Sequence, residues 1–419
     1  MKKSSVLSGA GLAAASILGA ILAGVLLMTA VYALPTARMR HNVEISLPYI
    51  LTEGDRYQWA PYHNGTELDG FTDSLMLSNA IYEGTGSPLH NALVNPRPEY
   101  TPGDMVPVDS LSRYAQKQEG FREVTYARYW HGYLLLLKPL LLFFTPSDIR
   151  LLNMMVQLIL ACVVLALCRK RGGLRLAIPM GAALLCLNPI STALCFQFTD
   201  VYLLLLTFAA GMLGLETYKK TWGWLLYLWL GILTAFFDFL TYPLAALGVL
   251  LAVEGMLTQG SPWEKIKGML LRSFLWVLGY GAMWAGKWVC ASLLTEQNVI
   301  ADALQNALGR TGAGERMSLI RVIWQNAQNY VNPMGKLLVL VLALVYALLS
   351  KTCRFRLSWR KAAPMLLLAL YPFVWYMALR NHSMIHAYMT HRNLAVTVMA
   401  VCCAVSLCLE ENKKGENNG

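Results

Sequence analysis

Long apolar stretches separated by short basic segments dominate the chain. No Lys, Arg, Asp or Glu occurs between Lys3 and Arg38, and further charge-poor stretches recur as far as residue 409. A helix that crosses the hydrocarbon core of a bilayer needs about 20 predominantly apolar residues. The pattern therefore predicts an all-α polytopic membrane protein.

The first apolar stretch has features of both a signal peptide and a retained helix. Lys2 and Lys3 precede it, and Val31-Tyr32-Ala33 has the small residues of a cleavage site. A signal peptide, however, has an apolar region of only about 7–15 residues, whereas this stretch continues to Leu34. We therefore expect residues 1–34 to form a retained first transmembrane helix.

The remaining charge-poor stretches, together with Gly and Pro breaks, predict nine more spans within residues 151–409. They are residues 151–168, 176–197, 200–217, 222–238, 239–257, 270–292, 334–350, 362–379 and 393–409. The expected total is about ten transmembrane helices. Two of the nine, 200–217 and 334–350, are short for a bilayer.

The distribution of basic residues predicts the orientation in the membrane. Short cytoplasmic connections are enriched in Lys and Arg. If the N-terminus is cytoplasmic, the basic connections fall on the cytoplasmic side, and they are residues 169–175, 219–220, 265–272 and 351–361. The C-terminus is then also cytoplasmic, and its polar tail, residues 410–419, is expected to be disordered. Segments 35–150 and 294–333 are extracytoplasmic.

This orientation explains the net charge. The formal charge is +11, yet residues 35–130 contain half of the 24 acidic residues and no cysteine. The excess of positive charge is therefore a topology signal, and no nucleic-acid-binding motif accompanies it. The pattern is compatible with a bacterial plasma membrane.

The first extracytoplasmic loop, residues 35–150, is too long to be a simple connection. Residues 72–84 have the pattern of a short helix, capped by Thr72 or Asp73 and stopped at Gly84. Residues 126–150 are rich in Tyr, Trp and Leu but are broken by a Lys-Pro pair, which predicts a helix lying in the membrane interface. The loop is expected to be a small folded domain.

Three carboxylates gather in residues 67–74 of this loop: Glu67, Asp69 and Asp73. Carboxylate oxygens can hold Mg²⁺ or Mn²⁺ against a phosphate, and a single carboxylate can be the general base for an acceptor hydroxyl. A structural explanation is also open, because Asp69-Gly70 is a common turn pair and Asp73 is a good N-cap.

Three basic residues follow in the expected interfacial segment: Arg128, His131 and Lys138. Cations at this depth can bind a lipid phosphate, and Arg does so with two parallel hydrogen bonds. Ordinary contact with lipid headgroups is the alternative.

The segment between the last two spans holds a second basic cluster and no acid. Its members are Arg380, His382, His386, His391 and Arg392. His382 and His386 are four residues apart and share a face if the helix continues. Without an acid, the cluster is better suited to an anion than to a metal. The alternative is a solvated loop with arginines at two helix ends.

Asp238 is the only charged residue between Lys220 and Glu254. An acid in such an apolar region is costly to bury, which makes it a functional candidate. It can also cap a tight turn, with Pro243 in the first turn of the next helix.

The layout resembles the GT-C superfamily of integral membrane glycosyltransferases. The resemblance is carried by LDGFTD at 68–73, YARYWHGY at 126–133 and NHSMIHAYMTHR at 381–392, together with the many spans and the long first loop. The chain departs from the family in having no adjacent pair of acidic residues in the first loop, which leaves open both metal dependence and the choice between Asp69 and Asp73.

The resemblance implies an enzyme that transfers a sugar from a polyprenyl-phosphate donor to a glycan, lipid or protein, in the assembly of cell-envelope glycans. Asp73 or Asp69 would act on the acceptor hydroxyl, with Mg²⁺ or Mn²⁺ as a possible cofactor. The residues expected to hold the donor phosphate are Arg128, His131, Lys138, His386, His391 and Arg392.

Three other classes of protein remain open. A polyprenyl-linked ligase or polymerase is disfavoured, because the longest loop of such enzymes usually comes late in the chain. A transporter or flippase for lipid-linked glycans is expected to contain internal repeats, and none is evident in the sequence. A non-catalytic protein of envelope assembly has no distinguishing sequence feature.

Overall fold

The computed structural model describes residues 3–103, 105–312, 318–349 and 353–411. Most of them are helical. The predicted disordered tail lies outside the described residues from residue 412 onward, and its first two residues belong to a short strand.

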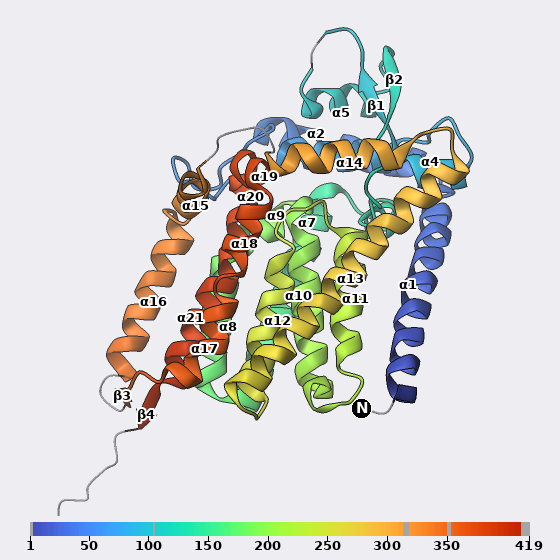
Figure 1. The fold of residues 1–419 in the computed structure, drawn as a ribbon. Coiled ribbons are helices and arrows are strands. Elements are labelled where there is room, and N and C mark those ends of the chain that lie inside the picture. The colour runs from blue at the N-terminus through green and yellow to red at the C-terminus, as the bar shows by residue number, and fades with distance from the viewer. Residues whose placement is uncertain (1–2, 104, 313–317, 350–352, 412–419) are drawn as a thin grey trace, which may run out of the picture.

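Helices that run in roughly the same direction form a bundle, and a smaller group of elements covers one end of it (Figure 1). The bundle helices, in chain order, are α1 (Lys3–Tyr32), α7 (Pro146–Gly172), α8 (Leu174–Cys186), α10 (Phe196–Leu215), α11 (Trp224–Phe237), α12 (Leu244–Leu257), α13 (Pro262–Leu294), α16 (Pro333–Leu349), α17 (Trp359–Leu368), α18 (Tyr371–Ala378) and α21 (Ala395–Leu407).

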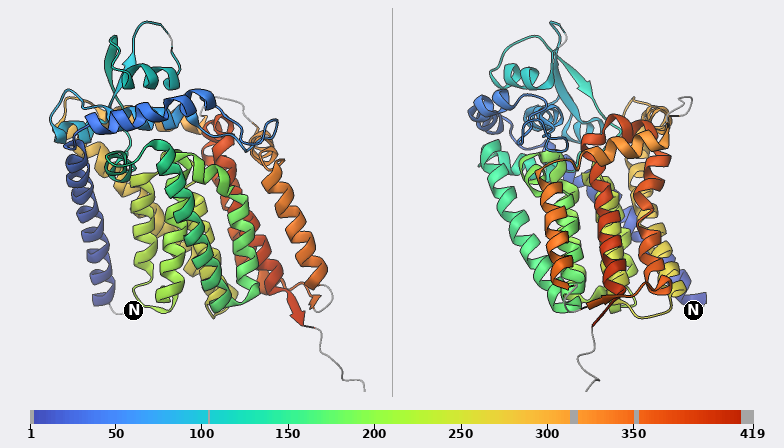
Figure 2. Two further views of the ribbon diagram at one scale, coloured as in Figure 1. Left: turned by 180° about the vertical axis from the view of Figure 1, so that it is seen from behind. Right: turned by 90° about the vertical axis from the view of Figure 1, so that its left-hand side faces the viewer.

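The group over the end of the bundle is called the cap, and it consists of the described residues of 35–145 and 295–332. Its elements are α2 (Ala37–Glu53), α3 (Gly70–Ile81), α4 (Pro88–Val94), β1 (Pro96–Tyr100), α5 (Pro107–Ala115), β2 (Phe121–Thr125), α6 (Leu134–Leu141), α14 (Val299–Thr311) and α15 (Leu319–Gln328). Helix α2 lies across the end of the bundle, and α5 and the antiparallel pair of β1 and β2 project away from it (Figure 2).

The connections between bundle helices contain short elements at both ends of the bundle. They are α9 (Pro189–Leu194), η1 (Thr217–Lys219), β3 (Cys353–Phe355), α19 (Arg380–Ile385), α20 (Ala387–Thr390), η2 (His391–Leu394) and β4 (Leu409–Glu411). Strands β3 and β4 pair antiparallel. The first turn of α1 and β4 both lie at the end opposite the cap (Figure 1).

Several helices are apolar enough for a membrane, in keeping with an all-α membrane protein. Among the described residues, five helical segments are both long and apolar enough to cross one, and the bent pair α15–α16 would make a sixth. Helices α8, α11 and α12 are apolar but only 13 or 14 residues long. The number that meets these criteria is therefore smaller than the predicted ten, although helices occur at every predicted position.

One predicted span differs clearly from the structure. Residues 176–197 do not form one helix, because α8 ends at Cys186 and the short α9 intervenes before α10. Asn188 adopts a left-handed conformation and accepts a hydrogen bond from the Ser191 amide, while Pro189 begins α9. An Asn-Pro pair inside an apolar run is therefore enough to end a helix here.

The described residues of 35–150 form helices and an antiparallel pair of strands, β1 and β2, and two details differ from the expectation. The helix expected at 72–84 occupies Gly70–Ile81, and its N-cap is Asp69, which accepts a hydrogen bond from the Thr72 amide. The single helix expected over 126–150 is not formed: residues 126–133 are irregular, α6 follows them, and the bundle helix α7 already begins at Pro146. Tyr129 and Trp130 are buried here instead of facing lipid headgroups. The buried Trp130 indole donates a hydrogen bond to the Met283 carbonyl oxygen.

Helices α11 and α13 approach each other very closely. A methyl group built on Gly231 would lie 2.1 Å from the Trp276 carbonyl oxygen, and one on Gly279 would lie 2.3 Å from that of Leu228. Small residues allow such approach between helices. The two glycines therefore allow the backbones of α11 and α13 to pack directly against each other.

We predict that Gly279→Ala destabilises the protein by about 1–3 kcal/mol, because the added methyl group forces the two backbones apart. Gly281→Ala is the matched control, since it lies on the same helix and a methyl group there meets nothing within 4 Å. Thermal unfolding of the purified protein in detergent measures both. Equal unfolding temperatures for the two variants would contradict the close contact.

Candidate functional site

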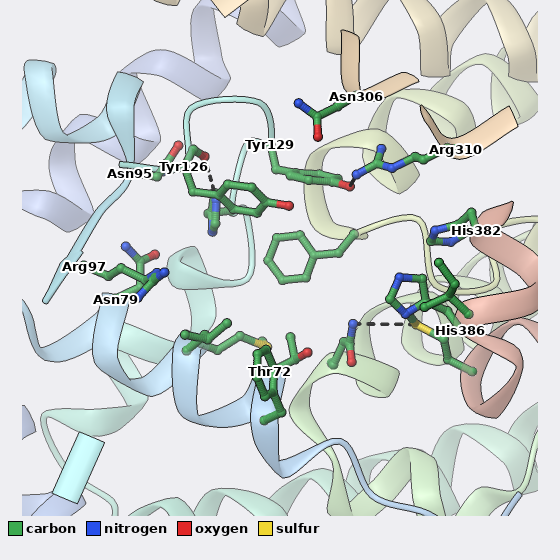
Figure 3. A pocket seen from close by; sticks show the side chains of 18 of the residues that line it. Thr72, Asn79, Asn95, Arg97, Tyr126, Tyr129, Asn306, Arg310, His382 and His386 are labelled. Atoms are coloured by element: carbon green, nitrogen blue, oxygen red, sulfur yellow. Dashed lines mark hydrogen bonds between the residues drawn. The ribbon is translucent and has the colours of Figure 1, made fainter. Parts of the chain in front are cut away.

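A cavity of about 860 Å³ lies where the cap meets the bundle (Figure 3). Helix α3 and the loop of residues 124–133 form one side, and α14 and the segment 381–389 form the other. Phe239, in the turn between α11 and α12, also borders it. This volume is within the range of about 300–1,000 Å³ that is typical of ligand sites.

Three arginines border the cavity, and none of them was singled out from the sequence. Arg56 lies 3.3 Å from Asp69, and Arg97 lies 3.1 Å from Glu99. Arg310 donates to the Tyr129 hydroxyl. Within the described part of the chain, no carboxylate is in salt-bridge distance of Arg310. Its charge is therefore the least neutralised of the three.

Aromatic and amide side chains supply much of the remaining wall. Tyr126, Tyr129, Tyr133 and Tyr388 border the cavity, with amides from both sides. In Figure 3, Asn79, Asn95 and Arg97 lie opposite His382 and His386, Tyr129 lies between the two groups, and Arg310 is on the side of the histidines. Rings offer flat apolar faces with polar edges, and amides both donate and accept. Such a wall suits a ligand with many hydroxyl groups beside an anionic group.

His131 borders the cavity and is held through both ring nitrogens. Nε2 lies 3.1 Å from the Tyr126 carbonyl oxygen, and Nδ1 lies 3.3 Å from the Tyr133 hydroxyl. A carbonyl only accepts, so Nε2 carries the hydrogen of the neutral ring. The single hydroxyl hydrogen of Tyr133 has two acceptors within reach, Nδ1 of His131 and Oδ1 of Asn79, and it is donated to one of them at a time. Burial lowers the pKa of His131 to about 3, so the ring is a neutral hydrogen-bonding group.

His382 and His386 meet in the cavity as their spacing predicted. Their ring centroids are 4.7 Å apart, and Nε2 of His382 lies 2.8 Å from the Leu240 carbonyl oxygen. Burial lowers the pKa of His382 to about 3 and also lowers that of His386. The pair therefore supplies polar contacts without the positive charge that was expected of it.

Asp69 is completely buried, one layer behind the cavity wall. Its carboxylate accepts from the Thr72 hydroxyl at 2.8 Å and from the Tyr388 hydroxyl at 3.0 Å. Arg56 completes the group, with its guanidinium 4.2 Å from the centre of the Tyr388 ring. Asp69 thereby positions three side chains that do border the cavity.

Asp73 faces α10 instead of the cavity. Its oxygens accept from the backbone amides of Phe196 and Gln197, each at 3.0 Å, and lie 3.7 Å from Arg150. The residue before α10 is Cys195, which offers no oxygen for a cap. Asp73 therefore caps a helix far away in the sequence. Burial raises its pKa to about 6, opposed by Arg150 and the two amides.

The carboxylate that borders the cavity is Asp302, in α14. Its side chain is 48% exposed, and both its oxygens accept from Nη1 of Arg128, at 3.0 and 2.8 Å. Arg128 was expected to bind phosphate, and here it holds Asp302 in place. Asp302 escaped notice because it stands alone in the sequence, without a second acid or a motif.

Four other candidate residues are committed to internal contacts away from the cavity wall. Lys138 donates to the Ala80 carbonyl at the end of α3, and burial lowers its pKa to about 8. Nδ1 of His391 lies 2.9 Å from the Ala387 carbonyl oxygen. Arg392 donates to the Leu187 and Tyr388 carbonyls.

The fourth, Asp238, accepts from the Thr241 amide at 3.1 Å and shapes the turn after α11. This agrees with its structural interpretation as a turn cap. Arg380 begins α19 and is half-buried, and it is not among the residues that border the cavity.

The predicted Mg²⁺ or Mn²⁺ site does not fit these contacts. Hydrogen-bond donors and arginines already surround Asp69 and Asp73. Within the described ranges, no three His, Cys, Asp or Glu side chains are grouped to hold a metal ion. In these contacts the two carboxylates hold the residues around the cavity in place.

No protein-family model, curated protein or solved structure matches this chain. The chemistry of the cavity therefore has to carry any assignment of function.

We predict that Asp73→Ala lowers the free energy of unfolding by about 0.5–2 kcal/mol, the usual cost of losing an N-cap. Asp73→Asn should cost less than Asp73→Ala without matching the wild type, because its single amide oxygen can replace only one of the two carboxylate oxygens that accept from Phe196 and Gln197. Thermal unfolding compares the two variants with the wild type. An Ala variant that unfolds at the wild-type temperature would contradict the capping contact.

We predict that stability falls as the pH drops from about 6.5 toward 3, in part through His382. The folded protein holds the pKa of His382 well below 6.5, so the unfolded chain takes up the proton first. At pH 5 the effect is on the order of 1–2 kcal/mol. Unfolding temperatures at pH 7.5 and pH 5 should differ less for His382→Gln than for the wild type. An unchanged difference would contradict the prediction.

Proposed function

We propose that this protein is a membrane glycosyltransferase that moves a sugar from a polyprenyl-phosphate donor to an acceptor in cell-envelope glycan assembly. The cavity beneath the cap is the proposed site, as the resemblance to the GT-C superfamily suggests. In this proposal the protein is a multi-pass protein of the bacterial plasma membrane with about ten spans, both termini are cytoplasmic, and the cap is extracytoplasmic.

The observation that carries the proposal is the junction of two unlike cavities. A small, mainly apolar cavity of about 140 Å³ lies among α3, α6, α7 and α10, and it shares Met76 and Tyr133 with the large polar one. A polyprenyl-phosphate sugar has the same division into an apolar chain and a polar head. The chain would lie along the apolar cavity, and the phosphate and sugar would enter the polar one.

The roles of the polar residues follow from their contacts. Arg310 has the least neutralised charge in the cavity and would stabilise the negative charge that develops on the donor phosphate. Asp302, oriented by Arg128, would accept the proton of the acceptor hydroxyl. The hydroxyl oxygen forms a bond to the anomeric carbon, the bond from that carbon to the phosphate oxygen breaks, and polyprenyl phosphate leaves with the electron pair.

A flippase for lipid-linked glycans is the second candidate, because the same two cavities would bind its cargo. Covalent transfer requires a proton acceptor, whereas transport requires only binding. Asp302 therefore separates the two functions.

We predict that Asp302→Asn and Arg310→Gln each reduce sugar transfer about 100-fold or more, since a general base or a charge-stabilising group typically contributes this much. A host strain lacking the gene, complemented with each variant, should accumulate the polyprenyl-phosphate sugar and lose one glycan residue. Mass spectrometry of lipids and surface glycans measures both.

Glu296→Gln is the matched control for Asp302→Asn, and Arg321→Gln is the matched control for Arg310→Gln. Each control removes one exposed charge, of the same sign as in its test variant, from a residue outside the cavity. Both controls should restore wild-type glycans. Full restoration by Asp302→Asn would argue against covalent transfer and place the flippase first.

A further inference from the structure

A third cavity, of about 640 Å³, lies in the cap among α3, α5 and β1. We call it the cap groove. Helix α5 and strands β1 and β2, which border it, project away from the apolar helices of the bundle (Figure 2). A ligand in the groove therefore reaches it from water.

The cap groove and the polar cavity adjoin. Phe71, Leu75 and Arg97 border both of them. The first two are on α3, and the third is on β1. A chain-like ligand lying in the groove can thus direct one end past Arg97 toward the site of proposed transfer.

The two arginines of the groove, Arg97 and Arg122, both contact its one described carboxylate, Glu99. Glu99 accepts from Arg122 at 2.9 Å and from Arg97 at 3.1 Å. The hydrogen bond from Arg122 is the main cause of the lowered pKa of Glu99, so this carboxyl is ionised. In contrast to the polar cavity with Arg310, the groove offers no cation without an acidic partner among its described residues. This favours an uncharged ligand.

Two serine hydroxyl groups in the groove are free to form hydrogen bonds with a ligand. Ser78 and Ser110 border it, and neither hydroxyl makes a hydrogen bond within the part of the chain that the structure describes. Tyr100 and Phe71 add partly exposed rings. Unpaired hydroxyls beside aromatic rings suit the hydroxyl groups and apolar faces of sugars.

A peptide strand is a poorer occupant. Peptides that bind beside a strand hydrogen-bond to its open edge. Two of the five residues of β1, Pro96 and Pro98, are prolines without an N–H group. The edge of β1 that faces away from β2 is therefore short of donors for an added strand.

We propose that the cap groove binds an uncharged oligosaccharide, which is the acceptor of the transfer reaction. The proposal rests on the proposed glycosyltransferase function for the word acceptor, whereas the binding of the oligosaccharide stands on the groove alone.

The test uses the full-length protein in lipid nanodiscs and two probes. An array of neutral oligosaccharides, acidic oligosaccharides and peptides tests the groove, and farnesyl phosphate, a short polyprenyl phosphate, tests the polar cavity. Ser110→Phe fills the groove with a ring, and Ser110→Ala is its matched control. Arg310→Gln disturbs only the polar cavity. Unfolding temperatures confirm that each variant folds.

Neutral oligosaccharides should bind the wild type. Ser110→Phe should weaken this binding at least tenfold while leaving farnesyl phosphate binding within about twofold. Ser110→Ala removes one hydroxyl without adding bulk and should weaken oligosaccharide binding by no more than about fivefold, and Arg310→Gln should leave it unchanged. Binding of acidic oligosaccharides or peptides alone, no binding at all, or binding that Ser110→Phe leaves unchanged would overturn the proposal. If the wild type does not bind farnesyl phosphate, the assignment of the polar cavity to the donor is wrong.

Discussion

The contact of Asp73 with the start of α10 holds the cap on the bundle. One carboxylate on α3 accepts from two backbone amides of α10 and lies near Arg150 of α7. Arg150 in turn donates to Glu53 at the end of α2. The first amides of a helix are unpaired and carry partial positive charge, so a buried carboxylate there is stabilised. Four helices are joined at this point.

The polar cavity depends on this contact. With Asp73 turned toward α10, three other residues of α3 border the cavity: Thr72, Met76 and Asn79. Asp69, at the start of the same helix, holds Arg56 and Tyr388 in the wall. The two acids that the sequence singled out are thus essential to the architecture of the site.

The sequence predicts the helices well because apolar stretches and proline breaks are local properties of the chain. It also places His131, His382 and His386 in the segments outside the predicted spans, and all three border the cavity. It cannot predict burial, which decides the charge of a side chain. These imidazoles are neutral because water is excluded from them, and the positive charge comes from arginines at 56, 97 and 310. Those arginines are isolated in sequence and converge only in the fold.

The direction in which a side chain points is a second property that the sequence does not encode. Arg392 belongs to the most basic segment of the chain, yet its guanidinium is buried 3.9 Å from the centre of the Phe198 ring. Asp302 belongs to no motif, yet it borders the cavity. Both outcomes are set by packing between elements that are far apart in the chain.

Arg97 gives the cap a property that neither cavity has alone. Its side chain borders both the polar cavity and the cap groove, so a ligand that moves this side chain alters both spaces. Equilibrium linkage then requires that the effect be reciprocal, with each ligand changing the affinity of the other by the same factor. Ligand contacts to this one guanidinium from both spaces would therefore couple the two binding equilibria.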